Sequence, residues 1–179
     1  MALLACATGV MGCGEGDAPW GPGRDTAAGR AEGAAGHGAP TFTGEVVAVT
    51  DGDTLRVMHA GREERIRLYG VDAPERAQPY SQRAKQLASS LVFGKAVQVQ
   101  VLDTDRYGRS VARVLLADGR DLGHELVQAG LAWWYEQFAR DDRALAALEQ
   151  EARRARRGLW ADASPQPPWE YRRQRKEAG

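Results

Sequence analysis

Short runs of apolar residues in the first half of the chain, several alternating with polar ones, predict consecutive β-strands. Glu45–Val49 runs into a turn at Asp51-Gly52, and Leu55–Val57 leads out of it, which is typical of a β-hairpin. A second turn at Ala60-Gly61 precedes a third strand at about Glu64–Tyr69. The pattern therefore predicts three meandering strands.

After Ser81 the apolar positions recur at the spacing of a helix rather than of a strand. From Ala84 to Leu91 they follow an i, i+3, i+4, i+7 pattern, and Gly94 can terminate the helix that this pattern predicts. We therefore expect one amphipathic helix after the third strand.

Alternation returns beyond this helix. Val97, Val99 and Val101 alternate with glutamines and predict a fourth strand, and Ser110–Leu116 predicts a fifth after a turn at Tyr107-Gly108. The chain thus contains five short strands with one inserted helix.

Two more helices are indicated by capping residues at both ends. Asp121 is a suitable N-cap for a short helix ending at Gly130, and Asp141 for another ending at Gly158. The second has an apolar face formed by three residues: Leu145, Leu148 and Ala152.

These elements predict an α+β, mainly β fold. A five-stranded OB-fold Greek-key barrel with about three helices accommodates them, and the open face of such a barrel can hold nucleic acid. The chain of 179 residues, 43% of them hydrophobic, has room for one such domain plus tails, and we place the domain at residues 41–163.

Residues 164–179 differ in composition from the predicted domain. The prolines of Pro165–Trp169 favour an extended run, and we expect Trp169 to pack back onto the domain. Arg172–Lys176 is a basic end that we expect to be disordered. Residues 150–179 carry eight Lys or Arg and four acidic residues, whereas the whole chain is neutral with 24 of each sign. A basic end of this kind can contact phosphates or be a solvated helix face.

Residues 1–13 resemble the leader of an exported protein. Ala2–Met11 is apolar but too short to span a bilayer. Val10-Met11-Gly12-Cys13 resembles a bacterial lipobox, with Leu3-Leu4-Ala5-Cys6 a poorer candidate. No Lys or Arg precedes the apolar run, so either the leader is unusual or the start codon is placed late. Residues 14–40, rich in Gly, Ala and Pro, predict a flexible tether. We expect an exported lipoprotein with membrane anchoring through Cys13, or a secreted protein.

Charged residues gather where the third strand ends. Arg67 lies on the strand face opposite to its apolar neighbours. Asp72 and Glu75, separated by a proline turn, can face one point, where a cation or an arginine would relieve their repulsion. Two other turns supply further charges: Asp51-Gly52-Asp53-Thr54 and Asp105-Arg106-Tyr107-Gly108-Arg109.

The three segments, in this order, resemble the motifs of the staphylococcal nuclease family. They are the Asp51–Thr54 turn, Arg67 followed by Val71-Asp72-Ala73-Pro74-Glu75, and the Asp105–Arg109 turn. The resemblance extends from about Phe42 to Trp160, with every charged position filled. It implies an OB-fold nuclease that hydrolyses the phosphodiester bonds of DNA and RNA with the help of Ca²⁺ and leaves 3′-phosphates.

The resemblance also implies a Ca²⁺ site made of the carboxylates of Asp53 and Asp72 and the backbone carbonyl of Ala73. Such oxygens are the ligands that Ca²⁺ prefers. The family often has Thr at the position of Ala73, so this chain lacks a hydroxyl there but keeps the carbonyl. Considered alone, Asp53 would be interpreted as a turn residue of the hairpin.

Three residues resemble the family's catalytic groups. Glu75 matches the general base or water-orienting carboxylate, and Arg67 and Arg109 match the two arginines that grip the scissile phosphate. A guanidinium suits this role because its planar fork pairs bidentately with phosphate and stays charged. In purely structural roles, Arg67 would pair with Asp72, Arg109 would cap a strand from its turn, and Glu75 would form a surface salt bridge. The candidate partners of Glu75 are two nearby arginines: Arg76 and Arg83.

Substrate contacts are expected from Arg106 and Tyr107, which resemble the family's Lys-Tyr pair. Tyr135 is a candidate for base stacking, although it aligns with neither family tyrosine without a shift, and we assign Trp133 and Trp134 to the core. The histidines lie outside the motifs and nothing marks them as ligands: His37, His59 and His124.

The sequence thus predicts a Ca²⁺-dependent nuclease, monomeric, with nucleic acid as substrate and no protein partner. The main alternative is a non-catalytic OB-fold module that binds nucleic acid or protein. Degenerate copies of this kind usually lack acidic or arginine positions, which this chain retains. A structural lipoprotein would rest on Cys13 alone and is compatible with nuclease activity.

Overall fold

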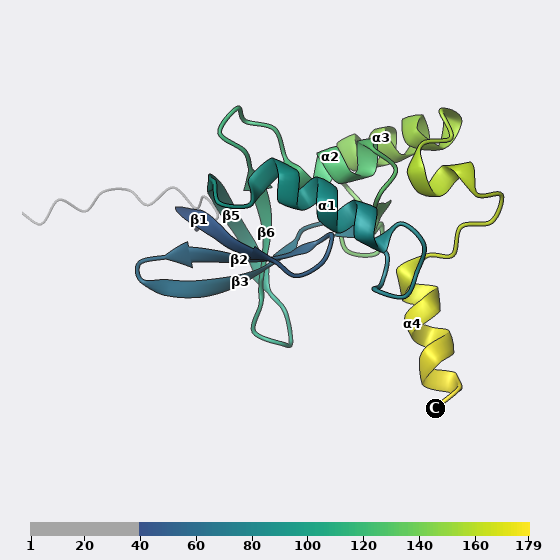
Figure 1. Cartoon of the computed structure of the whole chain (residues 1–179), viewed down its shortest axis with the longest axis horizontal. Helices are drawn as coiled ribbons and strands as arrows, with labels where there is room; N and C mark the ends of the chain where they lie inside the picture. The colour runs from purple at the N-terminus through teal and green to yellow at the C-terminus, as the bar shows by residue number, and fades with distance from the viewer. Residues whose placement is uncertain (1–39) are drawn as a thin grey trace, which may run out of the picture. The chain divides into compact units, whose positions relative to one another are not determined.

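Five strands of the computed structural model, which describes residues 40–179, close into a barrel with the order β1-β2-β3-β6-β5 (Figure 1). Neighbouring strands pair antiparallel except β3 and β6, which are parallel, so the barrel is mixed. The strands are β1 Thr41–Val49, β2 Thr54–His59, β3 Arg62–Leu68, β5 Ala96–Thr104 and β6 Ser110–Leu115. The predicted five-stranded OB-type barrel is confirmed.

The interior of the barrel is filled by the apolar positions that alternate along each strand. In the β2–β3 pair, Leu55 lies opposite Ile66, and both are fully buried. Arg67, the next residue, points to the other face. One-residue irregularities in β1 and β5 let these strands bend around the barrel.

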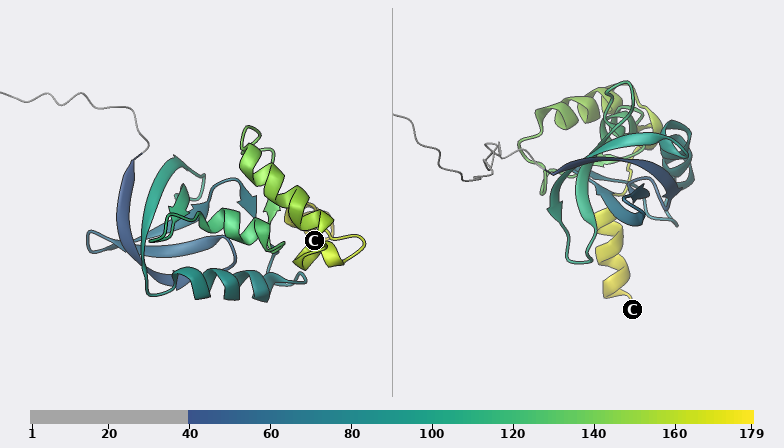
Figure 2. Two further views of the ribbon diagram at one scale, coloured as in Figure 1. Left: turned by 90° about the horizontal axis from the view of Figure 1, so that it is seen from above. Right: turned by 90° about the vertical axis from the view of Figure 1, so that its left-hand side faces the viewer.

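Three helices pack beside the barrel: α1 (Ser81–Val92), α2 (Leu122–Gln128) and α3 (Arg143–Arg154). The helix α1 contacts β1 and α2, and α2 contacts α3 and β6 (Figure 2). A short 3₁₀ helix, η1 (Gly158–Ala161), follows α3. All three predicted helices are present.

The predicted N-caps of α2 and α3 contain one error. Asp121 caps α2, accepting hydrogen bonds from the backbone N–H groups of Gly123 and His124. The cap of α3 is Asp142, not Asp141, because Oδ1 of Asp142 accepts a hydrogen bond from the N–H of Leu145 at 3.1 Å. Two consecutive aspartates made the choice ambiguous in the sequence.

The C-terminal segment forms a fourth helix, α4 (Pro168–Glu177), so the prediction of an extended and then disordered tail was wrong from Pro168 onward. Pro167 is extended, but Pro168 occupies the first turn of the helix, where a missing N–H leaves no bond unmade. The expected packing of Trp169 is confirmed, since its ring stacks on Tyr135.

A small second sheet pairs β4 (Val71–Asp72) with β7 (Trp133–Trp134), antiparallel. Cys6, Cys13 and the proposed leader and tether, apart from Pro40, lie outside the described residues. Within residues 40–179, no helix is both long and apolar enough to cross a membrane.

Candidate active site

The pairing of β2 with β3 brings the first two charged segments together. Thr54 lies opposite Arg67 in the register, and the N–H of Leu68 donates to the carbonyl of Asp53 at 2.9 Å. A side chain at Gly52 would collide with the Cβ atoms of Ala73 and Ala84, at 2.7 and 2.8 Å. A glycine at position 52 therefore allows the turn to lie this close to the end of β4 and to α1.

The β4–β7 pair places Asp72 beside that turn. Asp72 lies opposite Trp133 in the register and is only 1% exposed. The N–H of Ala73, the next residue, donates to Oδ2 of Asp53 at 2.6 Å. Three predicted metal ligands therefore lie together, although Asp53 comes from the turn before β2 and Asp72 and Ala73 from the end of β4.

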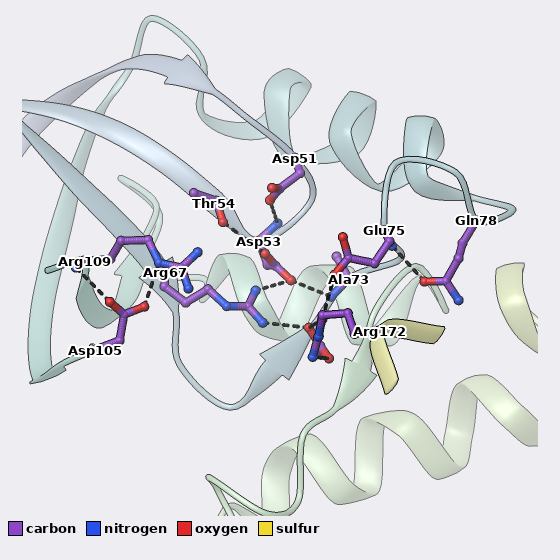
Figure 3. Close-up of polar contacts among 11 residues, drawn as sticks. Asp51, Asp53, Thr54, Arg67, Ala73, Glu75, Gln78, Asp105, Arg109 and Arg172 are labelled. Atoms are coloured by element: carbon purple, nitrogen blue, oxygen red, sulfur yellow. Dashed lines mark hydrogen bonds and ion pairs between the residues drawn. The ribbon is translucent and has the colours of Figure 1, made fainter. Parts of the chain in front are cut away.

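Arg67 links the two carboxylates. Its Nη1 forms an ion pair with Oδ2 of Asp53, and its Nη2 donates to Oδ1 of Asp72 at 2.7 Å. Figure 3 shows Arg67 and Asp53 directed toward each other, with Ala73 beside them. The pairing of Arg67 with Asp72, expected if Arg67 had a purely structural role, is present, and Asp53 is a second partner that the sequence did not indicate.

Burial and charge act in opposite directions on these groups. Burial disfavours ionisation of Asp53, but the charge of Arg67 and hydrogen bonds outweigh it and lower the pKa of this carboxyl. At Asp72 burial dominates over the two arginines that contact it, Arg67 and Arg172 of α4, and raises the pKa. Burial, together with the charge of Asp53, raises the pKa of Asp51 to about 6. The pKa of Arg67 is raised by both carboxylates against the effect of burial, so it remains charged.

Glu75 has a partner that sequence reasoning missed. Its Oε1 accepts a hydrogen bond from Nη1 of Arg172, in α4, at 2.8 Å, rather than from Arg76 or Arg83. Arg172 also contacts both carboxylate oxygens of Asp72. The only available signal was the proline pair before Trp169, which could have been interpreted as the start of a helix.

The third charged segment is organised around Asp105. Its Oδ1 accepts from the N–H groups of Tyr107 and Arg109, and its Oδ2 accepts from Nε of Arg109 at 2.7 Å. Burial disfavours ionisation of Asp105, but the hydrogen bonds from Arg109 and Tyr107 and the charge of Arg109 together outweigh it and lower the pKa of this carboxyl. Arg109 thus makes the local contact of a turn residue, and no contact with the Asp53–Asp72 pair is found among the described residues.

Arg106 and Tyr107 form an exposed part of the same turn. Tyr107 is 61% exposed, with the guanidinium of Arg106 over its ring at 4.8 Å and that of Arg109 at 5.6 Å. The parallel register places Ser110 opposite Ile66, so this turn enters the barrel near the strand that carries Arg67. The turn can therefore contribute contacts to a ligand lying over Arg67.

Tyr135 is already stacked within the protein. Its ring lies parallel to that of Trp169, with an interplanar angle of 3° and centroids 5.1 Å apart, and meets Phe138 edge-on at 4.7 Å. Trp133 is buried at 2% exposure, as expected for a core residue, and Trp134 is half-buried, donating from Nε1 to the carbonyl of Ala139. A base could stack only on the outer part of this aromatic group.

The donor chemistry at Asp53 and Asp72 fits a hard cation. Two buried carboxylates meet at Arg67, Asp72 also pairs with Arg172, and the backbone of Ala73 lies beside Asp53. Among residues 40–179, no group of three or more His, Cys, Asp and Glu side chains is arranged to hold a metal, so any ion would rely on backbone and solvent oxygens as well. The two described histidines lie elsewhere, since His59 stacks on Phe42 and His124 faces Arg113.

Barrel and site together define a small OB-type protein with an acidic and arginine cluster at the edge of the barrel. The model of the protein family described as "Staphylococcal nuclease homologue" matches residues 65–162 of this chain. A protein of Escherichia coli O157:H7 named "Uncharacterized endonuclease" is 46% identical over 129 residues, covering 72% of this chain and 84% of that protein.

Two further relatives carry more specific names. "Micrococcal nuclease" of Shigella flexneri is 39% identical over 146 residues, covering 76% of this chain and 84% of its own length. "Probable staphylococcal-like nuclease CAN1" of Oryza sativa subsp. japonica is 41% identical over 135 residues, which is 72% of this chain and 40% of that protein. The chain belongs to the staphylococcal nuclease family. The family match includes Arg67 and Glu75 but does not reach Arg172.

Proposed function

We propose that this protein is a Ca²⁺-dependent nuclease that hydrolyses the phosphodiester bonds of DNA and RNA and leaves 3′-phosphates. The observation that carries the proposal is the convergence of Asp53 and Asp72 on Arg67, with Glu75 beside them. The relatives named as nucleases support it.

In this mechanism, Asp53, Asp72 and the carbonyl of Ala73 would hold the cation. When bound, Ca²⁺ supplies positive charge that offsets the negative charge developing on the phosphate. Cation binding would also relieve the repulsion of two carboxylates that are almost fully removed from water. Competition from Arg67 for the same oxygens would set the affinity of the site for metal.

The side chains carry out the chemical step. Glu75 accepts a proton from a water molecule, whose oxygen forms a new bond to phosphorus as the bond to the 5′-oxygen breaks. The proton of Glu75 then returns to solvent, and the leaving 5′-oxygen takes up a proton, which leaves a 3′-phosphate and a 5′-hydroxyl. Glu75 is suited to this because its side chain is 39% exposed, so the carboxylate can reach water.

Arg67 and Arg109 are proposed to bind the phosphate. Both hold an aspartate in this structure, so both are pre-oriented, and the side chains are only 15% and 22% exposed. A preorganised guanidinium stabilises the transition state without reorienting during the reaction. Arg106 and Tyr107, on the exposed turn, would contact the neighbouring nucleotide, and Tyr135 would contact a base.

The test is digestion of plasmid DNA and of RNA with added Ca²⁺ and with excess chelator. Cleavage that requires Ca²⁺ and yields 3′-phosphate ends is expected, with Glu75→Gln as the inactive control. Undiminished cleavage in chelator would contradict the metal requirement. Salt-sensitive binding without any turnover would favour the non-catalytic OB-fold module instead.

A further inference from the structure

Arg172, in the C-terminal helix α4, adds a guanidinium to the candidate site beside that of Arg67. Its Nη2 donates to Oδ2 of Asp72 at 2.8 Å, while its Nη1 donates to Oδ1 of Asp72 at 3.2 Å and to Oε1 of Glu75 at 2.8 Å. Figure 3 shows its head group reaching the site beside Ala73 and Glu75. One side chain thus joins the proposed base to a proposed metal ligand.

The Glu75 carboxylate depends on this contact for its orientation. Among residues 40–179, Arg172 is its one ion-pair partner. The Glu75 backbone is held separately, because its N–H donates to Oε1 of Gln78 at 2.9 Å. Without Arg172, the loop would stay in place but the half-exposed carboxylate could change rotamer.

The approach of α4 to the site is held by several independent contacts. Trp169 stacks on Tyr135, whose N–H donates to the carbonyl of Gly70, just before β4. Nε2 of Gln78 donates to the carbonyl of Gln166 at 2.9 Å. Gln78 therefore contacts both the Glu75 loop and the segment before α4, so Arg172 is delivered from a fixed position.

The pair of Arg172 with Asp72, which is 1% exposed, compensates a buried charge and so contributes to the fold. Stability does not explain the contact with Glu75, because the side chains of Arg172 and Glu75 are 40% and 39% exposed, and ion pairs at such exposure contribute about 0–1 kcal/mol to folding. The rigid support of Arg172 instead matches what a precisely oriented functional group needs.

We propose that Arg172 is a positioning residue that holds the Glu75 carboxylate beside Asp72, in the orientation needed to accept a proton from the attacking water. This proposal rests on the nuclease function proposed above. It extends the site beyond the residues that the family match covers, to a helix at the end of the chain.

The experiment compares single-turnover cleavage of a labelled oligonucleotide by wild type, Arg172→Gln, Glu75→Gln and the double variant. Arg172→Gln should lower the rate by about 10- to 100-fold, the scale seen when a group that orients a functional residue is lost. Measured at saturating Ca²⁺, where an effect of Arg172 on metal binding through Asp72 no longer limits the rate, the double variant should be no slower than Glu75→Gln alone, because positioning of the Glu75 carboxylate has no effect once that carboxylate is gone. If the double variant instead lost rate by the product of the two single-variant losses, the proposal would be overturned.

Three controls separate positioning from other roles. Arg173→Gln removes the same charge from the next, exposed position of α4 and should leave the rate unchanged. Arg172→Lys should cleave faster than Arg172→Gln but more slowly than wild type, because lysine keeps the charge but cannot span Asp72 and Glu75 with one planar fork. Added guanidinium should partly restore cleavage by Arg172→Ala, which a merely structural loss would not allow.

Ca²⁺ affinity, measured by calorimetry without substrate, provides a readout besides activity. If Arg172 instead blocked the metal site, Arg172→Gln would bind Ca²⁺ more tightly and cleave faster than wild type, and the proposal would be overturned. If a folded Arg172→Gln variant cleaved at the wild-type rate, the positioning role of Arg172 would be rejected and the nuclease function would stand. Absence of cleavage by the wild type would reject the nuclease function and, with it, the positioning role.

Discussion

The N–H of Ala73 donates to Oδ2 of Asp53 at 2.6 Å, across a separation of 20 residues in the sequence. This hydrogen bond joins the hairpin turn between β1 and β2 to the end of β4, and the same carboxylate pairs with Arg67. Asp53 therefore has a structural role besides its proposed role as a metal ligand. Substitutions there should affect both properties.

We predict that Asp53→Asn weakens Ca²⁺ binding and also lowers the free energy of unfolding by about 1–3 kcal/mol, the cost of leaving a buried polar partner unsatisfied. Denaturant titration without metal and calorimetry with Ca²⁺ measure the two effects. Asp51→Asn, in the same turn, is the matched control for the loss of a carboxylate. Unchanged stability without metal would show that the Asp53–Arg67 pair does not support the fold.

Glu75→Gln should retain binding of nucleic acid and metal while lowering the cleavage rate by about 10²-fold or more, as expected when a general base is lost. The substitution removes the proton acceptor and leaves the Gln78 contacts to the backbone in place. Single-turnover cleavage with binding measured in parallel tests this. A variant that cleaves at the wild-type rate would exclude Glu75 as the base.

Arg109→Lys should severely reduce cleavage and leave the fold intact, because lysine keeps the charge but loses the fork that pairs with phosphate. Arg67→Lys should lose activity and also stability, since Arg67 lies buried between two carboxylates. Melting curves and cleavage rates of both variants distinguish the two cases. If both variants kept wild-type rates, the assignment of phosphate-binding arginines would be wrong.

Glu149 should make stability depend on pH. Its Oε1 accepts a hydrogen bond from the N–H of Trp134, and burial raises its pKa above the ordinary value of 4.5. The folded state therefore holds the proton more tightly than the unfolded chain, and the stability this gives below pH 4.5 is lost as the pH rises through the raised pKa.

Glu149→Gln should remove this loss, so wild type should become less stable relative to the variant as the pH rises above 4.5. Free energies of unfolding of wild type and Glu149→Gln, measured at a series of pH values from below to above 4.5, test this prediction. A stability difference for Glu149→Gln that is constant with pH would contradict the prediction.

Cys13 is predicted to be the lipidated residue of a processed, exported form. The prediction rests on the Val10-Met11-Gly12-Cys13 run and the glycine-rich segment after it, which lie outside the described residues. Intact-mass measurement of the protein from its native host tests this. A mass that still includes Met1 would exclude processing, and Cys6, the other cysteine, serves as the comparison site for mapping the lipid.

The sequence alone determined the barrel and most of its helices, because those features depend on local periodicity. The burial of Leu55 and Ile66 follows from alternation, and the cap at Asp121 follows from side-chain chemistry close in the chain. The charged motifs likewise identified Arg67 and Asp72 as neighbours, since they flank the end of a single strand.

Only the tertiary structure decided which distant groups complete the site. The pairing of β4 with β7, which places Asp72 next to Trp133, joins two-residue strands too short to show a period. Arg172 reaches Glu75 because Trp169 stacks on Tyr135 and so fixes the start of α4. No local pattern encodes a contact of this kind, because it depends on how separate parts of the chain pack in space.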